Sequence, residues 1–123
     1  MAVPVSVLLV EDDESTASAT CQLLVLLGFE VTWKPDRAQA VEAMCSYQHF
    51  EVVLLDLRLG NERGEQVIAD ASSQGCSIPP VVILSAQPDS ELQDAARMSS
   101  AKGVLRKPCT AREIQLAIER AIA

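Results

Sequence analysis

Acidic, hydroxyl and amine side chains stand at or directly after apolar runs in this 123-residue sequence. Four acids, Glu11–Glu14, follow the first run, and Asp56 ends the run Val52–Asp56. Ser85 follows a later run, and Lys107 stands just beyond the last one. If these runs are parallel strands, their carboxyl ends share one edge of a sheet, where α/β proteins bind ligands. The placement of these residues therefore predicts a single polar site.

The acids of this set favour a divalent cation. Clustered carboxylates repel one another and raise each other's pKa unless a cation lies between them. A site with few protein oxygens and several waters suits Mg²⁺ better than Ca²⁺. Asp56 between such a metal and Lys107 is suited to attack a phosphoryl group, because both cations neutralise charge on the transferring oxygens. The product would be an aspartyl phosphate, to which the Ser85 hydroxyl could donate a hydrogen bond.

Each of these residues also has a purely structural interpretation. Asp13 or Glu14 could cap the helix that follows the first run, which is at least as common a role for an acid in that place. Taken alone, Ser85 would be a turn residue and Lys107 a solvated charge. Asp56 is harder to explain in this way, because charges at the end of buried strands are seldom left unpaired. Only the joint placement predicts a site.

The elements that must position these residues are five apolar runs alternating with segments of helical period. The expected strands are Val5–Val10, Phe29–Trp33, Val52–Asp56, Val81–Leu84 and Gly103–Arg106. The expected helices cover about 14–27, 36–47 and 62–73, a stretch after the Pro88–Asp89 turn, and a last helix opening with the capping-box pattern Thr110–Glu113. Five such units predict one α/β domain over residues 1–123, with a doubly wound, five-stranded parallel sheet covered by helices on both faces.

Composition excludes several other classes of protein. Ten Lys and Arg against seventeen Asp and Glu give a formal charge of −7, which disfavours binding to nucleic acid and to anionic membranes. No apolar stretch approaches the ~20 residues that span a bilayer, and the first residues lack the positive charge of a secretory signal. We therefore expect a cytoplasmic protein with no membrane insertion and no direct contact with nucleic acid.

The cysteines and the larger aromatic side chains are expected to be structural. The cysteines are Cys21, Cys45, Cys76 and Cys109. They form no CxxC pair and no zinc-finger spacing with the single histidine, so buried free thiols are the expectation. Trp33 and Tyr47 are expected to be partly buried.

Four segments, in this order, resemble the receiver domain of two-component response regulators and hybrid sensor kinases. They are Val7–Asp13, Val53–Leu59 with Gly64 eight residues beyond the aspartate, Leu84–Ala86 and Leu105–Pro108. The resemblance covers essentially the whole chain. It implies a CheY-like, (βα)5 flavodoxin-like fold.

The resemblance also implies the roles of the acidic residues. Asp56 occupies the position of the phosphoacceptor. Glu11 and Asp12 match the acid pair that binds Mg²⁺, with Asp12 as the direct ligand and Asp13 outside the pair. The backbone carbonyl of Arg58, two residues beyond the acceptor, would complete the protein's share of the metal ligands.

The resemblance implies a function in a two-component phosphorelay. Such domains accept a phosphoryl group from a phosphohistidine of a sensor histidine kinase or a histidine phosphotransfer protein, and the signal is a change in partner binding. Their chemistry is intrinsic phosphotransfer and autodephosphorylation, so the chain would not be an enzyme in its own right. Ser85 and Lys107 match the hydroxyl and the amine that contact the phosphoryl group, with a cis bond between Lys107 and Pro108. Val104 stands where the family carries an aromatic residue that turns inward on phosphorylation.

Two other interpretations receive less support from the residues. A pseudo-receiver that only binds a partner usually lacks the acceptor or the lysine, and both are present here. A phosphohydrolase with an aspartate nucleophile carries a second aspartate two residues on, and this sequence has Arg58 there.

Overall fold

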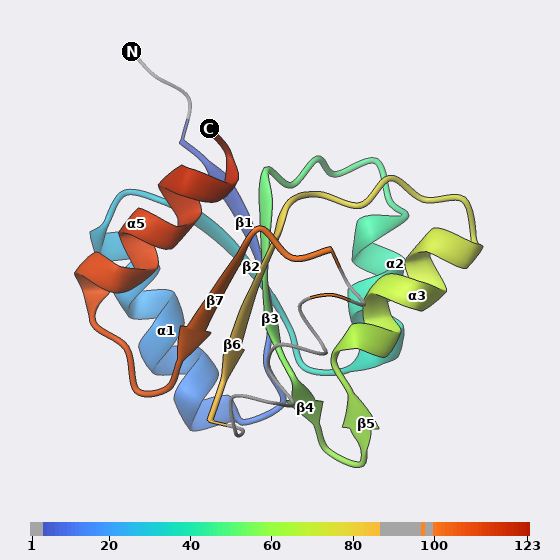
Figure 1. Cartoon of the computed structure of the whole chain (residues 1–123), viewed down its shortest axis with the longest axis horizontal. Helices are drawn as coiled ribbons and strands as arrows, with labels where there is room; N and C mark the ends of the chain where they lie inside the picture. Colours follow the sequence, from blue (N-terminus) through green and yellow to red (C-terminus); the bar gives the residue numbers. More distant parts are fainter. Residues whose placement is uncertain (1–3, 87–96, 98–99) are drawn as a thin grey trace.

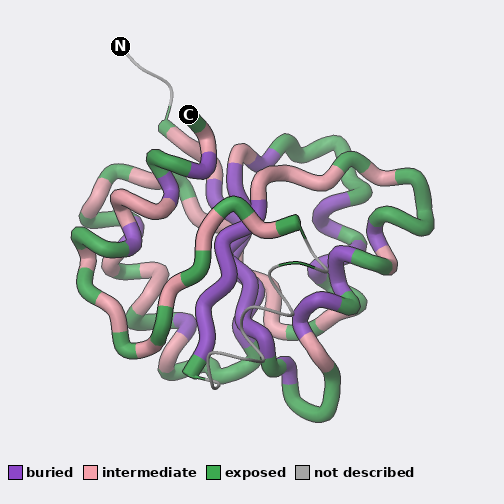
Figure 2. The backbone as a smooth tube through the Cα atoms, in the orientation of Figure 1, coloured by how far each residue is buried: buried purple, intermediate pink, exposed green. Residues whose placement is uncertain are grey.

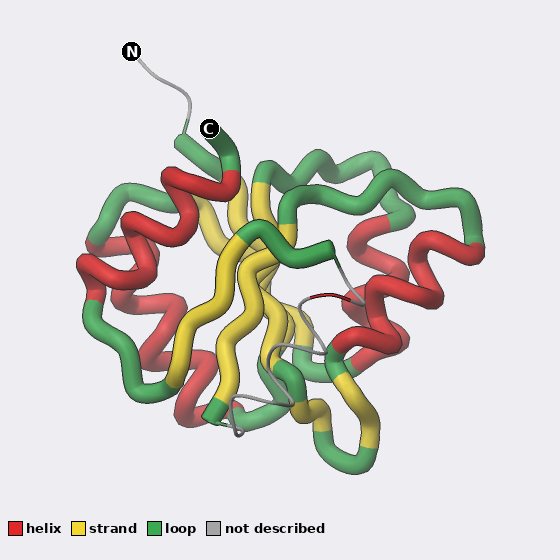
Figure 3. The backbone as a smooth tube through the Cα atoms, in the orientation of Figure 1, coloured by secondary structure: helices red, strands yellow, loops and turns green. Residues whose placement is uncertain are grey.

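Alternating strands and helices run through the residues that the structure, a computed structural model, describes: 4–86, 97 and 100–123 (Figures 1 and 3). The strands are β1 Ser6–Val10, β2 Glu30–Lys34, β3 Val52–Asp56, β4 Arg58–Leu59, β5 Glu62–Arg63, β6 Val81–Ser85 and β7 Gly103–Arg106. The helices are α1 Glu14–Leu26, α2 Arg37–Met44, α3 Glu65–Ser73 and α5 Ala111–Ala121. The helix expected after the Pro88–Asp89 turn lies outside the described residues.

The five long strands form one parallel sheet in the order β2–β1–β3–β6–β7. This confirms the predicted α/β fold with a five-stranded parallel sheet. The chain moves outward from β1 to β2 and then returns to the other side of β1 to form β3. The strand order therefore reverses between β1 and β3, and doubly wound sheets bind ligands at such a reversal, beyond the carboxyl ends of the strands.

The core lies on both faces of this sheet. Helices α1 and α5 cover one face, and α2 and α3 cover the other (Figure 1). Alternate residues of β1 pack into the core on opposite faces of the sheet, because successive side chains of a strand point to opposite faces. Val7 and Leu9 pack toward α1 and α5, whereas Leu8 and Val10 pack toward α2 and α3. Strands β3 and β6 are buried along their whole length (Figure 2).

Side-chain caps lie at the starts of α1, α2 and α5, and Asp36 caps α2 by accepting a hydrogen bond of 2.8 Å from the Gln39 amide. Asp13 is the N-cap of α1 and accepts a hydrogen bond of 2.8 Å from the Thr16 amide. Thr110 and Glu113 form the predicted capping box of α5, with hydrogen bonds in both directions. Among the described residues, no helix has the length and the apolar character that crossing a membrane would require.

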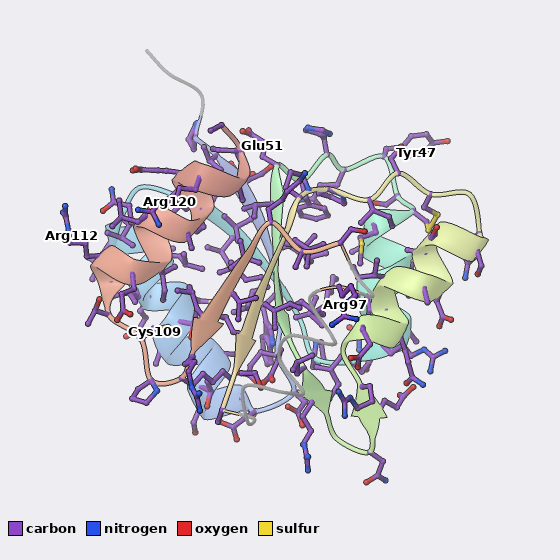
Figure 4. The ribbon with its side chains drawn as sticks, viewed as in Figure 1. Tyr47, Glu51, Arg97, Cys109, Arg112 and Arg120 are labelled. Carbon is purple, nitrogen blue, oxygen red and sulfur yellow. A yellow bond between two sulfur atoms is a disulfide. The ribbon has the colours of Figure 1, made fainter. Side chains whose placement is uncertain are left out.

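Helix α2 ends three residues before the predicted end, which changes the environment of Tyr47. Cys45 is the C-cap, and the Ser46 hydroxyl donates a hydrogen bond of 2.7 Å to the Ala43 carbonyl. This side-chain bond to the last turn competes with continuation of the helix. The expectation of a partly buried Tyr47 is wrong: the side chain is fully exposed and points away from the domain (Figure 4).

A short hairpin precedes α3, so this helix begins at Glu65 rather than near residue 62. Strands β4 and β5 pair antiparallel, with Leu59 opposite Glu62. Gly60 turns the chain between them with a φ of 61°, a conformation that other residues adopt at a cost. The Gly60–Asn61 pair is a known hairpin signal, and it could have located this turn from the sequence.

The expectation of four free thiols is wrong for Cys45 and Cys76, which form a disulfide between the ends of α2 and α3 (Figure 4). Cys45 caps α2, and Cys76 follows the turn that ends α3. Their Cα atoms lie 5.2 Å apart, within the usual range for a disulfide. Packing of α2 against α3 brings the two cysteines together although 31 positions separate them in the sequence. Their spacing therefore did not predict the disulfide. Cys21 and Cys109 are free and half-buried.

Reduction of this disulfide is expected to lower the free energy of unfolding by about 3–4 kcal/mol, because the link removes loop-closure entropy from the unfolded chain. Urea unfolding with and without a dithiol reductant measures the difference. The Cys45→Ser variant is the control and should be insensitive to the reductant. Equal stability of oxidised and reduced wild type would contradict the expectation.

Candidate functional site

Four strands bring the predicted site residues to one edge of the sheet. Glu11 follows β1, Asp56 ends β3, Ser85 ends β6 and Lys107 follows β7. The register pairs Asp56 with Leu84, so Ser85 lies one position beyond the partner of the aspartate. Glu11, Asp56 and Ser85 are 3%, 9% and 1% exposed. Buried polar groups of this kind need partners, and the neighbouring strand ends provide several of them.

Lys107 connects the two buried carboxylates. Its ammonium nitrogen lies 2.6 Å from Glu11 Oε1 and 2.8 Å from Asp56 Oδ2. Hydrogen bonds between charged groups are short and strong, so this pair of contacts fixes the positions of all three side chains. The backbone amide of Lys107 also donates to the Ser85 carbonyl at 2.9 Å. The bond from Lys107 to Pro108 is cis, as the family resemblance implies.

The surroundings of Glu11 shift its protonation. The pKa of the Glu11 carboxyl is raised to about 7, because burial and the neighbouring Asp56 both raise it more than Lys107 lowers it. Burial lowers the pKa of Lys107, but its hydrogen bonds to Asp56 and Glu11 outweigh that effect, so the net pKa is raised. Lys107 is therefore a stable cation, whereas Glu11 changes its charge near neutral pH.

Three of the acids lie close enough together to hold a cation. Ligand oxygens of Glu11, Asp12 and Asp56 all lie within 4.8 Å of one another. Three carboxylates against the single ammonium of Lys107 leave an excess of negative charge, and carboxylate oxygens are the ligands that Mg²⁺ prefers. The cluster thus fits a divalent cation both in chemistry and in spacing.

The loop after Asp56 approaches this cluster with its backbone. The Arg58 amide donates to Asp56 Oδ1 at 3.1 Å, and the Gly60 amide donates to Asp12 Oδ2 at 2.9 Å. These contacts place Arg58 beside Asp56, and the use of the Arg58 carbonyl as a metal ligand stays a prediction. Asp13 lies outside the cluster and caps α1, as the sequence suggested.

The sequence alone did not predict that two further residues, Trp33 and Gly64, contribute to this site. The Trp33 indole donates a hydrogen bond of 2.7 Å to the Glu11 carbonyl. Gly64 packs so closely on the chain that an added Cβ would lie 2.0 Å from the Asp56 carbonyl oxygen. The place of Gly64 beside the second family segment, Val53–Leu59, was a signal for the glycine, whereas nothing in the spacing of Trp33 pointed to Glu11.

The sequence profile of the response regulator receiver domain matches residues 7–119. The chain belongs to this family. The match includes all the strands of the parallel sheet except the first residue of β1, and every residue of the site described above. The family is one of signalling domains, and the match confirms the resemblance of the four sequence segments to it.

Known receiver domains resemble this one over most of its length. The chain is 36% identical over 103 residues to the swarming motility regulation protein RssB of Serratia marcescens, covering 84% of the chain and 46% of RssB. It is 36% identical over 110 residues to the sensory transduction protein RegX3 of Mycolicibacterium smegmatis, covering 89% of the chain and 46% of RegX3. The chain thus spans about half the length of these regulators.

A solved receiver domain shares the fold across both chains. It belongs to a sensor histidine kinase of Pseudomonas aeruginosa and has a magnesium ion coordinated in its active site cleft. The identity is 26%, the TM-score is 0.86, and the alignment covers 98% of each chain.

Proposed function

We propose that this receiver domain is a phosphoacceptor of a two-component phosphorelay, with Asp56 as the residue that takes the phosphoryl group. The observation that carries the proposal is the contact of one ammonium group with two buried carboxylates at the sheet edge. A lysine ammonium that donates to two carboxylates can transfer one of these hydrogen bonds to an incoming phosphoryl oxygen and keep the other. We assign the domain to residues 1–123.

The acceptor reaction needs a nucleophile, a means of neutralising charge and a leaving group. An Asp56 carboxylate oxygen attacks the phosphorus of a phosphohistidine, the new P–O bond forms, and the P–N bond breaks. The electron pair of that bond stays on the imidazole nitrogen of the donor, which takes up a proton. Lys107 neutralises charge on the transferring oxygens, and the Ser85 hydroxyl donates a hydrogen bond to one of them once they have arrived.

Glu11, Asp12, Asp56 and the carbonyl of Arg58 would hold Mg²⁺ at this site. When bound, the ion supplies positive charge against the oxygens of the phosphoryl group. Support comes from the spacing of the three acids and from the magnesium ion reported in the Pseudomonas aeruginosa receiver domain. Gly60 contributes by holding Asp12 through its amide, which orients a carboxylate that is otherwise exposed.

The partners follow from this chemistry. The donor would be a sensor histidine kinase or a histidine phosphotransfer protein in the cytoplasm, and the output would be a change in binding to a further domain or protein. The chain's own chemistry would be limited to accepting the phosphoryl group and releasing it to water, so it would act as a signalling element rather than as an enzyme. The family's aromatic readout residue is replaced by Val104, which is half-exposed on β7.

Intact mass after incubation with acetyl phosphate and Mg²⁺ tests the proposal. Wild type should gain one phosphoryl group, and chelation of the metal before the incubation should prevent the gain. Asp56→Asn should gain none. Asp13→Asn is the matched control, because it removes a nearby charge but keeps a capping side chain, and it should behave as wild type. A pseudo-receiver would show no gain in any of the proteins.

Affinity for Mg²⁺ is expected to depend on pH through Glu11. Protons compete with the metal for this carboxylate, so affinity should fall by up to about tenfold per pH unit below the Glu11 pKa of about 7 and level off above it. Calorimetric titration of the protein with MgCl₂ across this range measures the profile. Glu11→Gln should bind more weakly at high pH and show a flatter profile. Identical profiles for the two proteins would contradict the expectation.

A further inference from the structure

Trp33 reaches the acid cluster from an edge strand. It lies on β2, opposite Leu9 of β1, and its indole nitrogen donates to the Glu11 carbonyl at 2.7 Å. It is also the sole tryptophan of the chain. The ring is half-buried in the core between the sheet and helices α1 and α5, so packing fixes the direction of its N–H group.

The backbone amide and the backbone carbonyl of Glu11 both form hydrogen bonds with residues of β2. Its amide donates to the Lys34 carbonyl at 3.2 Å, and its carbonyl accepts from Trp33. The pairing of β1 with β2 ends at Val10 and Lys34, so regular sheet bonding does not extend to this carbonyl. A buried carbonyl without a donor is costly, and the indole supplies the donor at the point where the strand becomes the acidic loop.

We propose that Trp33 is a positioning residue of the metal site, whose indole N–H fixes the chain at Glu11 so that Glu11 and Asp12 point toward Asp56. The inference rests on the proposed function, because it gives Trp33 a role in that same site. Lys107 contacts the carboxylate of Glu11, and Trp33 donates to the backbone carbonyl of the same residue. Without the indole bond, the loop can rotate away from the arrangement in which the three acids share one cation.

The Trp33→Phe variant tests this role, because phenylalanine keeps an aromatic ring in the core and removes the N–H donor. Affinity for Mg²⁺, measured by calorimetry, is expected to fall between about twofold and tenfold, which corresponds to one hydrogen bond. The rise in melting temperature on adding Mg²⁺ should shrink as well. This second readout separates positioning from a general loss of stability, because it compares each variant with its own metal-free form.

Thr32→Val is the matched control on the same strand. Thr32 accepts a hydrogen bond of 3.0 Å from the Gln48 side chain, and it lies opposite Leu8, on the sheet face that is away from Trp33. Its substitution also removes one side-chain hydrogen bond of β2. Affinity for Mg²⁺ in this variant should equal that of wild type.

The single indole resonance in a ¹H–¹⁵N spectrum gives an independent signature. It is expected to shift during a MgCl₂ titration of wild type with the same midpoint as the calorimetric binding curve. Equal affinities of Trp33→Phe and Thr32→Val, or an indole resonance that does not move while wild type binds the ion, would overturn the role of Trp33 and leave the proposed function intact. Absence of Mg²⁺ binding by wild type would instead overturn the proposed function, and this inference with it.

Discussion

Replacement of Gly64 by alanine is expected to destabilise the domain by about 3 kcal/mol or more and to impair the site, because overpacking against backbone is not relieved by rotation of a side chain. An added Cβ would lie 2.0 Å from the Asp56 carbonyl oxygen and 3.1 Å from the Leu57 Cα. The Gly64 amide donates to the Leu57 carbonyl at 2.7 Å, which holds the two segments together. Relief of the clash must therefore displace the backbone at Asp56 and Leu57.

Chemical unfolding and the acetyl phosphate reaction measure the two consequences of Gly64→Ala. Gly103→Ala is the matched control, because an added Cβ there meets only Val82 methyl groups at 3.7 and 3.9 Å, which is ordinary contact. That variant should retain stability and phosphoryl uptake. A Gly64→Ala protein with the stability and the phosphoryl uptake of the control would show that the close approach to Asp56 has no consequence.

Substitution of Lys107 by methionine is expected to lower phosphoryl uptake and to raise the affinity for Mg²⁺. Phosphoryl uptake from acetyl phosphate should fall by roughly 10²-fold or more, the size of effect seen when one charge-stabilising group is removed from a reacting oxygen. Affinity for Mg²⁺ should rise, because the cation that neutralises Glu11 and Asp56 is gone while their carboxylates remain. A structural role alone would weaken both functions together.

Calorimetric titration with MgCl₂ and the rate of phosphoryl uptake test this prediction on the same protein samples. Lys102→Met is the control, because Lys102 is an exposed lysine that precedes β7 and has no role in the site. It should match wild type in both measurements. Parallel losses of metal affinity and phosphoryl uptake in Lys107→Met would contradict the proposed division of roles.

The fold and the main polar cluster could be predicted because both follow from periodicity. Apolar runs such as Val52–Asp56 are recognisable as buried strands, and parallel strands must present their carboxyl ends at one edge. The convergence of Glu11, Asp56, Ser85 and Lys107 is a consequence of that rule. The caps of α1 and α5 were predictable for a similar reason, since a cap depends on residues within one turn.

The remaining features depend on distances that spacing along the chain does not encode. The Cys45–Cys76 disulfide requires the packing of α2 against α3, and the contact of Trp33 with Glu11 requires the register of β2 against β1. The end of α2 before Tyr47 coincides with a side-chain hydrogen bond from Ser46 to the Ala43 carbonyl, a kind of bond that competes with another turn of helix. The hairpin at Gly60 was the exception, because its turn signal was present in the sequence.

Chemical trapping shows whether Asp56 itself carries the phosphoryl group. Borohydride reduces an aspartyl phosphate to homoserine, so the modified position can be located by peptide mass analysis after the reaction with acetyl phosphate and Mg²⁺. We expect homoserine at position 56, and none when Mg²⁺ is chelated before the reaction. Homoserine at Asp12 or Asp13, or a phosphoryl group on Ser85 with Asp56 unmodified, would show that Asp56 is not the phosphoacceptor.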